Sequence, residues 1–135
     1  MRREQQVIHI LLVEDNPGDV RLFQEALKQI SLATLLRIVD DGEQALAFLQ
    51  KAGEYHTAPT PQVVFLDSTL PKEPGYHVLA AIRRHPTLRS LPVYLMLESE
   101  YGKKLLESAG IEVGNSLVKT VSVEELEAIL RQCQR

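Results

Sequence analysis

The stretch that decides the fold is Pro61–Gly75, PQVVFLDSTLPKEPG. Four apolar residues, VVFL, run directly into Asp67, and a turn rich in proline and polar residues then ends at Gly75. The apolar run predicts a buried strand that carries one carboxylate at its C-terminal end. Because an unpaired buried carboxylate is costly, we expect Asp67 either to be paired with another group or to be used in function.

Segments with strand and helix patterns alternate along the chain. Further apolar runs predict strands at residues 7–13, 35–39, 93–97 and 116–118. Apolar residues at helical spacing predict helices near residues 17–31, 45–53, 76–85, 98–108 and 122–133. Asn16 before Pro17, and Ser122 three residues before Glu125, are typical helix starts. This alternation predicts an α/β fold, in which helices cover both faces of a parallel sheet.

Composition limits the classes of function. The 135 residues are 44% hydrophobic and 24% charged, which is typical of one globular domain, and we expect a single domain over residues 1–135. A net charge of -3 and scattered basic residues argue against a nucleic-acid-binding face. The chain has no apolar run near the roughly 20 residues that span a bilayer, and the charged start MRREQQ is unlike a signal peptide. We therefore expect a cytoplasmic protein without membrane contact. Cys133 is the single cysteine, which excludes an internal disulfide and a cysteine zinc site.

Charged side chains follow three of the predicted strands. Glu14 and Asp15 follow the first strand, Asp67 ends the third, and Lys119 follows the fifth. In open parallel sheets the ligand site lies beyond the C-terminal strand ends, so we expect these four side chains to converge. Two carboxylates about 5 Å apart repel by roughly 3 kcal/mol at an effective dielectric constant of 20. Mg²⁺ prefers oxygen ligands and removes this repulsion, so the pattern predicts a Mg²⁺ site that could receive a phosphoryl group.

Three of these four residues also have an ordinary interpretation. Asp67 could form a turn, Asp15 could assist Asn16 in capping a helix, and Lys119 could be a surface lysine. The convergent site is favoured because three strands end in this way at one edge of the sheet.

Five segments together resemble the receiver domain of two-component response regulators. In chain order they are LLVEDNPGDVRLFQEAL, DDGEQALAFL, VVFLDSTLPKEPGYHVLAAIRR, LPVYLML and LVK. VEDNPGDVRL and the DG-ALAFL segment look most like stand-alone receivers found beside bacterial phytochrome kinases. The resemblance implies a flavodoxin-like, doubly wound fold with five parallel strands in the order 2-1-3-4-5 and five helices. It also implies a receiver without an output domain.

The resemblance implies a role for each residue at the predicted site. Asp67 would be the phosphoacceptor, attacking a phosphohistidine on a partner histidine kinase, which could be a phytochrome. Asp15 and Asp67 would hold Mg²⁺ directly, Glu14 would act mostly through water, and the backbone carbonyl of Thr69 would be a further ligand. Lys119 would contact a phosphoryl oxygen. We therefore predict a signalling module that works through protein contact or phosphorelay, and not an enzyme.

Five positions depart from the family's pattern. Leu97 stands where threonine or serine is usual, and Glu98 stands where a small residue is usual. Ser116 replaces the aromatic residue expected on the fifth strand, and Pro74 replaces an aspartate in the loop after the third. Thr120 replaces the proline after the lysine, which removes the usual reason for a cis peptide bond. The acceptor, metal and lysine positions are thus intact, while the positions that read out phosphorylation are altered.

These departures leave an alternative open. The chain could be a pseudo-receiver, a protein-interaction module of the same fold that phosphate does not switch. A haloacid-dehalogenase-like phosphatase is disfavoured, because it needs a second acid two residues after the first, where this chain has Thr69. Flavodoxin is disfavoured because the acidic turn EDNPGD would repel an FMN phosphate.

Apolar residues near the C-terminus suggest a homodimer. The face formed by the fourth helix, fifth strand and fifth helix is where receivers often dimerise. This region of the chain supplies the apolar residues Leu105, Leu106, Ile111, Val113 and Val121, and we expect part of this set to lie in the core.

Overall fold

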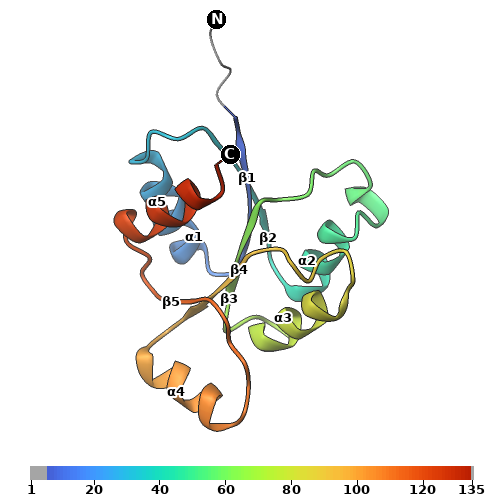
Figure 1. Ribbon diagram of the computed structural model, residues 1–135, viewed down its shortest axis with the longest axis vertical. Helices are drawn as coiled ribbons and strands as arrows, with labels where there is room; N and C mark the ends of the chain where they lie inside the picture. Colours follow the sequence, from blue (N-terminus) through green and yellow to red (C-terminus); the bar gives the residue numbers. More distant parts are fainter. Residues whose placement is uncertain (1–5, 135) are drawn as a thin grey trace, which may run out of the picture.

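The computed structural model describes residues 6–134 and contains one five-stranded parallel sheet between two layers of helices (Figure 1). The strands are β1 (Ile8–Val13), β2 (Thr34–Val39), β3 (Val63–Asp67), β4 (Val93–Leu97) and β5 (Ser116–Val118). The helices are α1 (Pro17–Lys28), α2 (Gly42–Leu49), α3 (Gly75–Arg84), α4 (Glu100–Ser108) and α5 (Val123–Gln132), with a 3-10 turn η1 (Gly53–Tyr55). The strand order β2-β1-β3-β4-β5 confirms the flavodoxin-like, doubly wound fold.

The burial of each strand follows from its place in the sheet. β3 lies between β1 and β4, and all five of its residues are buried, including Asp67. β1 is also buried except at His9, whereas the edge strand β2 is largely exposed. The continuous apolar run of β3 is the pattern of a strand covered on both faces. The Asp67 carboxylate is therefore held at the end of the most buried strand.

Two apolar cores hold the helices against the sheet. α1 and α5 lie together on one face, and α2 and α3 lie on the other (Figure 1). On the first face, Phe23 of α1 packs edge-on against Phe65 of β3 with 5.0 Å between ring centroids, beside Leu126 of α5. On the second face, Phe48 of α2 and Ile82 of α3 belong to one buried cluster.

Helix α4 is the exception to this packing. It has no buried residue over its described length, and Figure 1 shows it apart from the other helices, near the ends of β4 and β5. Leu105 is 53% exposed and Tyr101 is 69% exposed, while Leu106 packs partly against the core. Val113 and Val121, also expected on a dimer face, are buried in the monomer. Part of the apolar set therefore belongs to the core, as expected, and the homodimer stays a prediction.

The two helix starts expected from the sequence are confirmed. The Asn16 side chain accepts a hydrogen bond of 3.1 Å from the Asp19 backbone N–H, with Pro17 as the first residue of α1. Ser122 and Glu125 form a reciprocal capping box at the start of α5. Both caps satisfy backbone donors that the first helical turn leaves free.

Three helix boundaries differ from the predictions. α1 ends at Lys28, three residues before the expected end, and α2 ends at Leu49 before the chain turns through Lys51 at φ 57°. α4 begins at Glu100 because the Ser99 side chain accepts a 3.1 Å hydrogen bond from Gly102 N–H as the N-cap. The periodic patterns ran past these ends because capping geometry, which apolar spacing does not report, decides where a helix stops.

The structure bears on the prediction about membrane spans but not on the prediction about the start of the chain. Within residues 6–134, no helix is both long and apolar enough to cross a bilayer. The charged start at residues 1–5 lies outside the described residues.

Candidate functional site

The C-terminal ends of β1, β3 and β5 bring the four predicted site residues together. Glu14 is 1% exposed and Asp67 is 2% exposed, while Asp15 is exposed at the start of the turn into α1. One carboxylate oxygen from each of these three residues lies within 4.8 Å of the others. Lys119 Nζ lies 3.0 Å from both Glu14 Oε1 and Asp67 Oδ1. The fold therefore assembles a small acidic cluster, in which the buried carboxylates of Glu14 and Asp67 share one ammonium group.

The loop after β3 holds the Asp67 carboxylate in a defined position. Thr69 N–H donates a 3.2 Å hydrogen bond to Asp67 Oδ1. Gly75 N–H donates to the Ser68 carbonyl at 3.0 Å, so the loop returns tightly onto the strand end. A side chain at Gly75 would collide with the backbone oxygen of Asp67, so only glycine permits this approach. The Thr69 carbonyl as a metal ligand stays a prediction.

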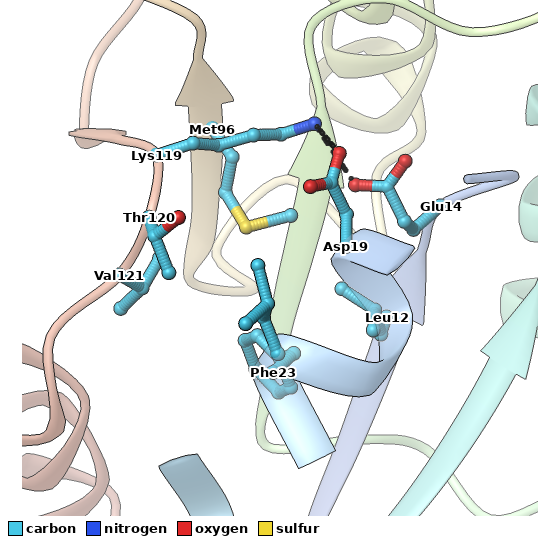
Figure 2. Close-up of a pocket in the computed structure, with 9 residues that line it drawn as sticks. Leu12, Glu14, Asp19, Phe23, Met96, Lys119, Thr120 and Val121 are labelled. Atoms are coloured by element: carbon cyan, nitrogen blue, oxygen red, sulfur yellow. Dashed lines mark hydrogen bonds and ion pairs between the residues drawn. The ribbon is translucent and has the colours of Figure 1, made fainter. Parts of the chain in front are cut away.

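Lys119 is the centre of the charge network. Besides Glu14 and Asp67, its Nζ lies 2.8 Å from Asp19 Oδ2 and 3.3 Å from Glu98 Oε1. Figure 2 shows the Lys119 side chain extending over Met96 toward the carboxylates of Asp19 and Glu14. Only 11% of the Lys119 side chain is exposed. One buried cation is therefore shared among four carboxylates.

Sequence reasoning missed two of these four contacts. Asp19 lies in the first turn of α1, four residues after Asp15, which places it beside the predicted site. This spacing of about one helical turn from Asp15 could have been used to predict Asp19 as a member of the site. Glu98 was noted only because it replaces a small residue of the family's pattern, and its contact with Lys119 depends on the path of the chain after β4, which no local pattern specified.

The electrostatics show how crowded the carboxylates are. The pKa of Glu14 is raised to about 7, first because burial removes water from its carboxyl group and then because Asp67 lies beside it; Lys119 acts in the opposite direction. Burial acts to lower the pKa of Lys119, but hydrogen bonds to Asp19, Asp67 and Glu14 outweigh burial and raise this pKa above its ordinary value. Lys119 is thus firmly charged, and the negative charge around it exceeds what one ammonium group neutralises.

Two hollows flank Lys119. An open pocket of about 450 Å³ lies over the carboxylates and is lined by Asp15, Asn16, Pro17, Asp19, Asp67, Thr69, Leu70, Pro71, Glu98 and Lys119. A much smaller cavity of about 20 Å³ lies beneath Lys119, where Figure 2 shows Leu12, Phe23 and Val121. The polar pocket has room for a hydrated cation and a phosphoryl group, whereas the smaller cavity holds about one water molecule.

The departures from the family's pattern have clear structural consequences. Leu97 is buried with the α2–α3 core, so the position that usually carries a hydroxyl is filled by an apolar side chain. Ser116 is half-buried at the start of β5. The oxygen of Ser99, the nearest hydroxyl after Leu97, is engaged as the α4 cap.

One expectation about the backbone was wrong. The Lys119–Thr120 peptide bond is cis, although Thr120 replaces the usual proline. Residue type sets only a local preference for trans. Here the backbone on each side of the bond is held by tertiary contacts: Lys119 N–H donates to Leu97 O at 2.8 Å, and Val121 is buried against α5.

Known proteins share this fold and sequence pattern. The family model described as the response regulator receiver domain matches residues 10–131. The response regulator Rcp1 of Synechocystis sp. is 40% identical over 117 residues, which cover 87% of this chain and 80% of Rcp1. The Mn(2+)-bound form of Rcp1 gives a TM-score of 0.73 at 38% identity, covering 93% of this chain and 90% of that one.

Two further solved structures are similar over nearly the whole chain. The bacteriophytochrome response regulator AtBRR gives a TM-score of 0.83 at 35% identity, covering 95% of this chain and 93% of that one. The phosphorylated cyanobacterial phytochrome response regulator RcpA gives a TM-score of 0.75 at 35% identity, covering 94% and 91% of the two chains.

Proposed function

The chain belongs to the response regulator receiver family, and from that premise we propose that Asp67 accepts a phosphoryl group from a phosphohistidine of a partner kinase. Solved structures similar to it include phytochrome response regulators. The observation that carries the proposal is the position of Asp67. It is buried at the end of β3, with Lys119 Nζ 3.0 Å from Oδ1 and an open pocket above it.

The proposed reaction is an in-line transfer. A carboxylate oxygen of Asp67 attacks the phosphorus atom, a P–O bond forms, and the P–N bond to the kinase histidine breaks. The electron pair of the broken bond stays on the histidine nitrogen. The hydrogen bond from Thr69 N–H helps to orient the attacking carboxylate. Lys119 lies where its ammonium group can stabilise the negative charge on the transferred group.

The acidic cluster fits a bound Mg²⁺. Asp15 and Asp67 would hold the ion directly, Glu14 would act mainly through water, and the Thr69 carbonyl would be a further ligand. The raised pKa of Glu14 supports this assignment, because burial comes first and the neighbouring Asp67 second among its causes, and a bound cation would offset both. When bound, Mg²⁺ supplies charge neutralisation for the phosphoryl oxygens.

A sensor histidine kinase is the proposed partner, and a phytochrome kinase is the candidate that the relatives suggest. AtBRR and RcpA support this choice because both are phytochrome response regulators and both are similar over most of this chain. The α1 helix and the loops around Asp67 would meet the kinase. The cytoplasmic location and the absence of nucleic-acid binding stay predictions.

The pseudo-receiver alternative is less well supported. A phosphorylation-independent module has no need for Glu14, Asp67 and Lys119 to remain buried together at one strand edge. Burying several charges together is costly even when they are paired, so a module without phosphate chemistry would gain nothing by keeping them there. The altered positions Leu97 and Ser116 bear on the response to phosphate and not on its acceptance.

The proposal is tested by phosphorylation with a purified kinase or a small phosphodonor. We expect Mg²⁺-dependent label that is base-labile, and its complete loss in Asp67→Asn. Asp40→Asn, an exposed aspartate outside the site, is the control and should be labelled like the parent chain. Absence of label in the parent chain with both donors, or label that persists in Asp67→Asn, would contradict the proposal.

A further inference from the structure

The Glu98 carboxylate reaches Lys119 from a different side than the other three carboxylates. Glu14 and Asp67 come from the central strands, and Asp19 comes from α1. Glu98 directly follows β4 and directly precedes Ser99, the N-cap of α4. Its Oε1 accepts a 3.3 Å hydrogen bond from Lys119 Nζ. Glu98 is therefore a direct link between the proposed phosphorylation site and the start of α4.

Four carboxylates already compete for the Lys119 ammonium group, which donates hydrogen bonds to Asp19 and Glu98 and lies 3.0 Å from Glu14 Oε1 and Asp67 Oδ1. An ammonium group has three N–H donors, and four carboxylates already lie within 3.3 Å of Nζ. Glu98 is the easiest to displace, because its contact is the longest and its side chain is 64% exposed. The other three carboxylates are held by the sheet or by α1, and their side chains are less exposed.

A phosphoryl group on Asp67 would compete with Glu98 for the same ammonium group. Its oxygens would carry negative charge into the open pocket that Glu98 also lines. The negative phosphoryl oxygens would repel the Glu98 carboxylate in this shared pocket. They would also attract Lys119 more strongly than one exposed carboxylate does. Phosphorylation should therefore separate Glu98 from Lys119.

We infer that Glu98 is an internal competitor for Lys119, and that phosphorylation of Asp67 releases Glu98 and with it the first turn of α4. This inference rests on the proposed function and names how the same site is regulated. α4 is suited to respond, because it has no buried residue over its described length. The release of Glu98 supplies a charge-based signal at a strand end where Leu97 offers no hydroxyl group.

The test measures binding of beryllium fluoride, a phosphoryl mimic, in the presence of Mg²⁺. Glu98→Gln keeps the size of the side chain and removes its charge. We expect it to bind the mimic roughly two- to fivefold more tightly than the parent chain, as is typical of removing an exposed charge contact. Glu100→Gln, two residues away on α4, removes the same charge outside the Lys119 contacts and should leave the affinity within about 1.5-fold.

Two further readouts separate this role from a general change in charge. In the parent chain, beryllium fluoride should shift the backbone amide signals of residues 98–105. Ligand-free Glu98→Gln should already show part of that shift, and Glu100→Gln should not. The affinity difference between Glu98→Gln and the parent chain should also shrink at high salt, because Glu98 is exposed.

The outcomes distinguish this inference from the proposed function. If the parent chain binds beryllium fluoride but Glu98→Gln and Glu100→Gln behave alike, Glu98 is not a competitor and the inference is wrong. The same conclusion follows if the mimic leaves the α4 amide signals unchanged. If the parent chain does not bind the mimic with Mg²⁺, the acceptor site is wrong and both proposals fail.

Discussion

The two sides of Lys119 differ sharply in how firmly they are held. On the β1–β3 side, Glu14 and Asp67 are almost fully buried at the ends of central strands. On the β4–α4 side, Glu98 is 64% exposed and leads into a helix with no buried residue. The groups proposed to do chemistry are therefore fixed by the core, while the group proposed to respond leads into the weakly packed helix α4.

The helices that follow these two sides show the same difference. α5, which follows Lys119, buries Leu126, Ile129 and Leu130 against the sheet. α4, which follows Glu98, exposes Tyr101 and Leu105. A region with few buried apolar contacts opens at lower free energy than the global unfolding reaction. α4 can therefore move while the acceptor site stays in place.

The largest expected effect comes from equal truncations in the two helices. Leu126→Ala should lower the free energy of unfolding by about 4 kcal/mol, because Leu126 is fully buried and its loss leaves a cavity. Leu105→Ala, at a half-exposed position of α4, should change it by less than about 0.5 kcal/mol. Urea unfolding measures both values. Equal losses would show that α4 is packed as firmly as α5.

Removing the shared cation is the next strongest change. Lys119→Met should lower the free energy of unfolding by about 3 kcal/mol at neutral pH without metal, because two buried carboxylates lose their partner. Lys104→Met, an exposed lysine of α4, is the control and should have little effect. Mg²⁺ should restore part of the loss in Lys119→Met. A variant as stable as the parent chain would mean that the carboxylates do not depend on Lys119.

Metal binding should stabilise the buried side of the site. Mg²⁺ at ten times its dissociation constant should raise the free energy of unfolding by about 1.4 kcal/mol, since it binds only the assembled cluster. Asp15→Asn should remove most of this increase, because Asp15 is one of the two carboxylates proposed to hold Mg²⁺ directly. Asp40→Asn again serves as the control. Thermal unfolding with and without Mg²⁺ measures the difference, and equal stabilisation of all three chains would contradict the metal assignment.

The smallest effect concerns the caps of the same two helices. Ser122→Ala removes a reciprocal capping box and should cost about 1 kcal/mol of global stability. Ser99→Ala should cost less globally, because α4 can fray while the core stays folded. Hydrogen exchange should show faster opening of α4 alone in Ser99→Ala. Faster exchange throughout the chain would show that α4 unfolds together with the core.

Much of the fold and of the candidate site could be predicted from the sequence. Apolar runs in β3 and β4 predicted buried strands, and the alternation with helices predicted the layered parallel sheet. Charged residues at strand ends predicted which side chains meet, because parallel strands end at one edge. The helix caps at Asn16 and Ser122 were also predicted, since capping depends on residues close in sequence.

Only the tertiary structure decided how the charges are shared. The contacts of Asp19 and Glu98 with Lys119 join residues 100 and 21 positions apart in the chain. The weak packing of α4, the cis bond after Lys119 and the raised pKa of Glu14 likewise depend on distant neighbours. Periodicity and capping are local properties of the chain. Electrostatic and packing energies depend on distances in space, which exist only after the strands have come together.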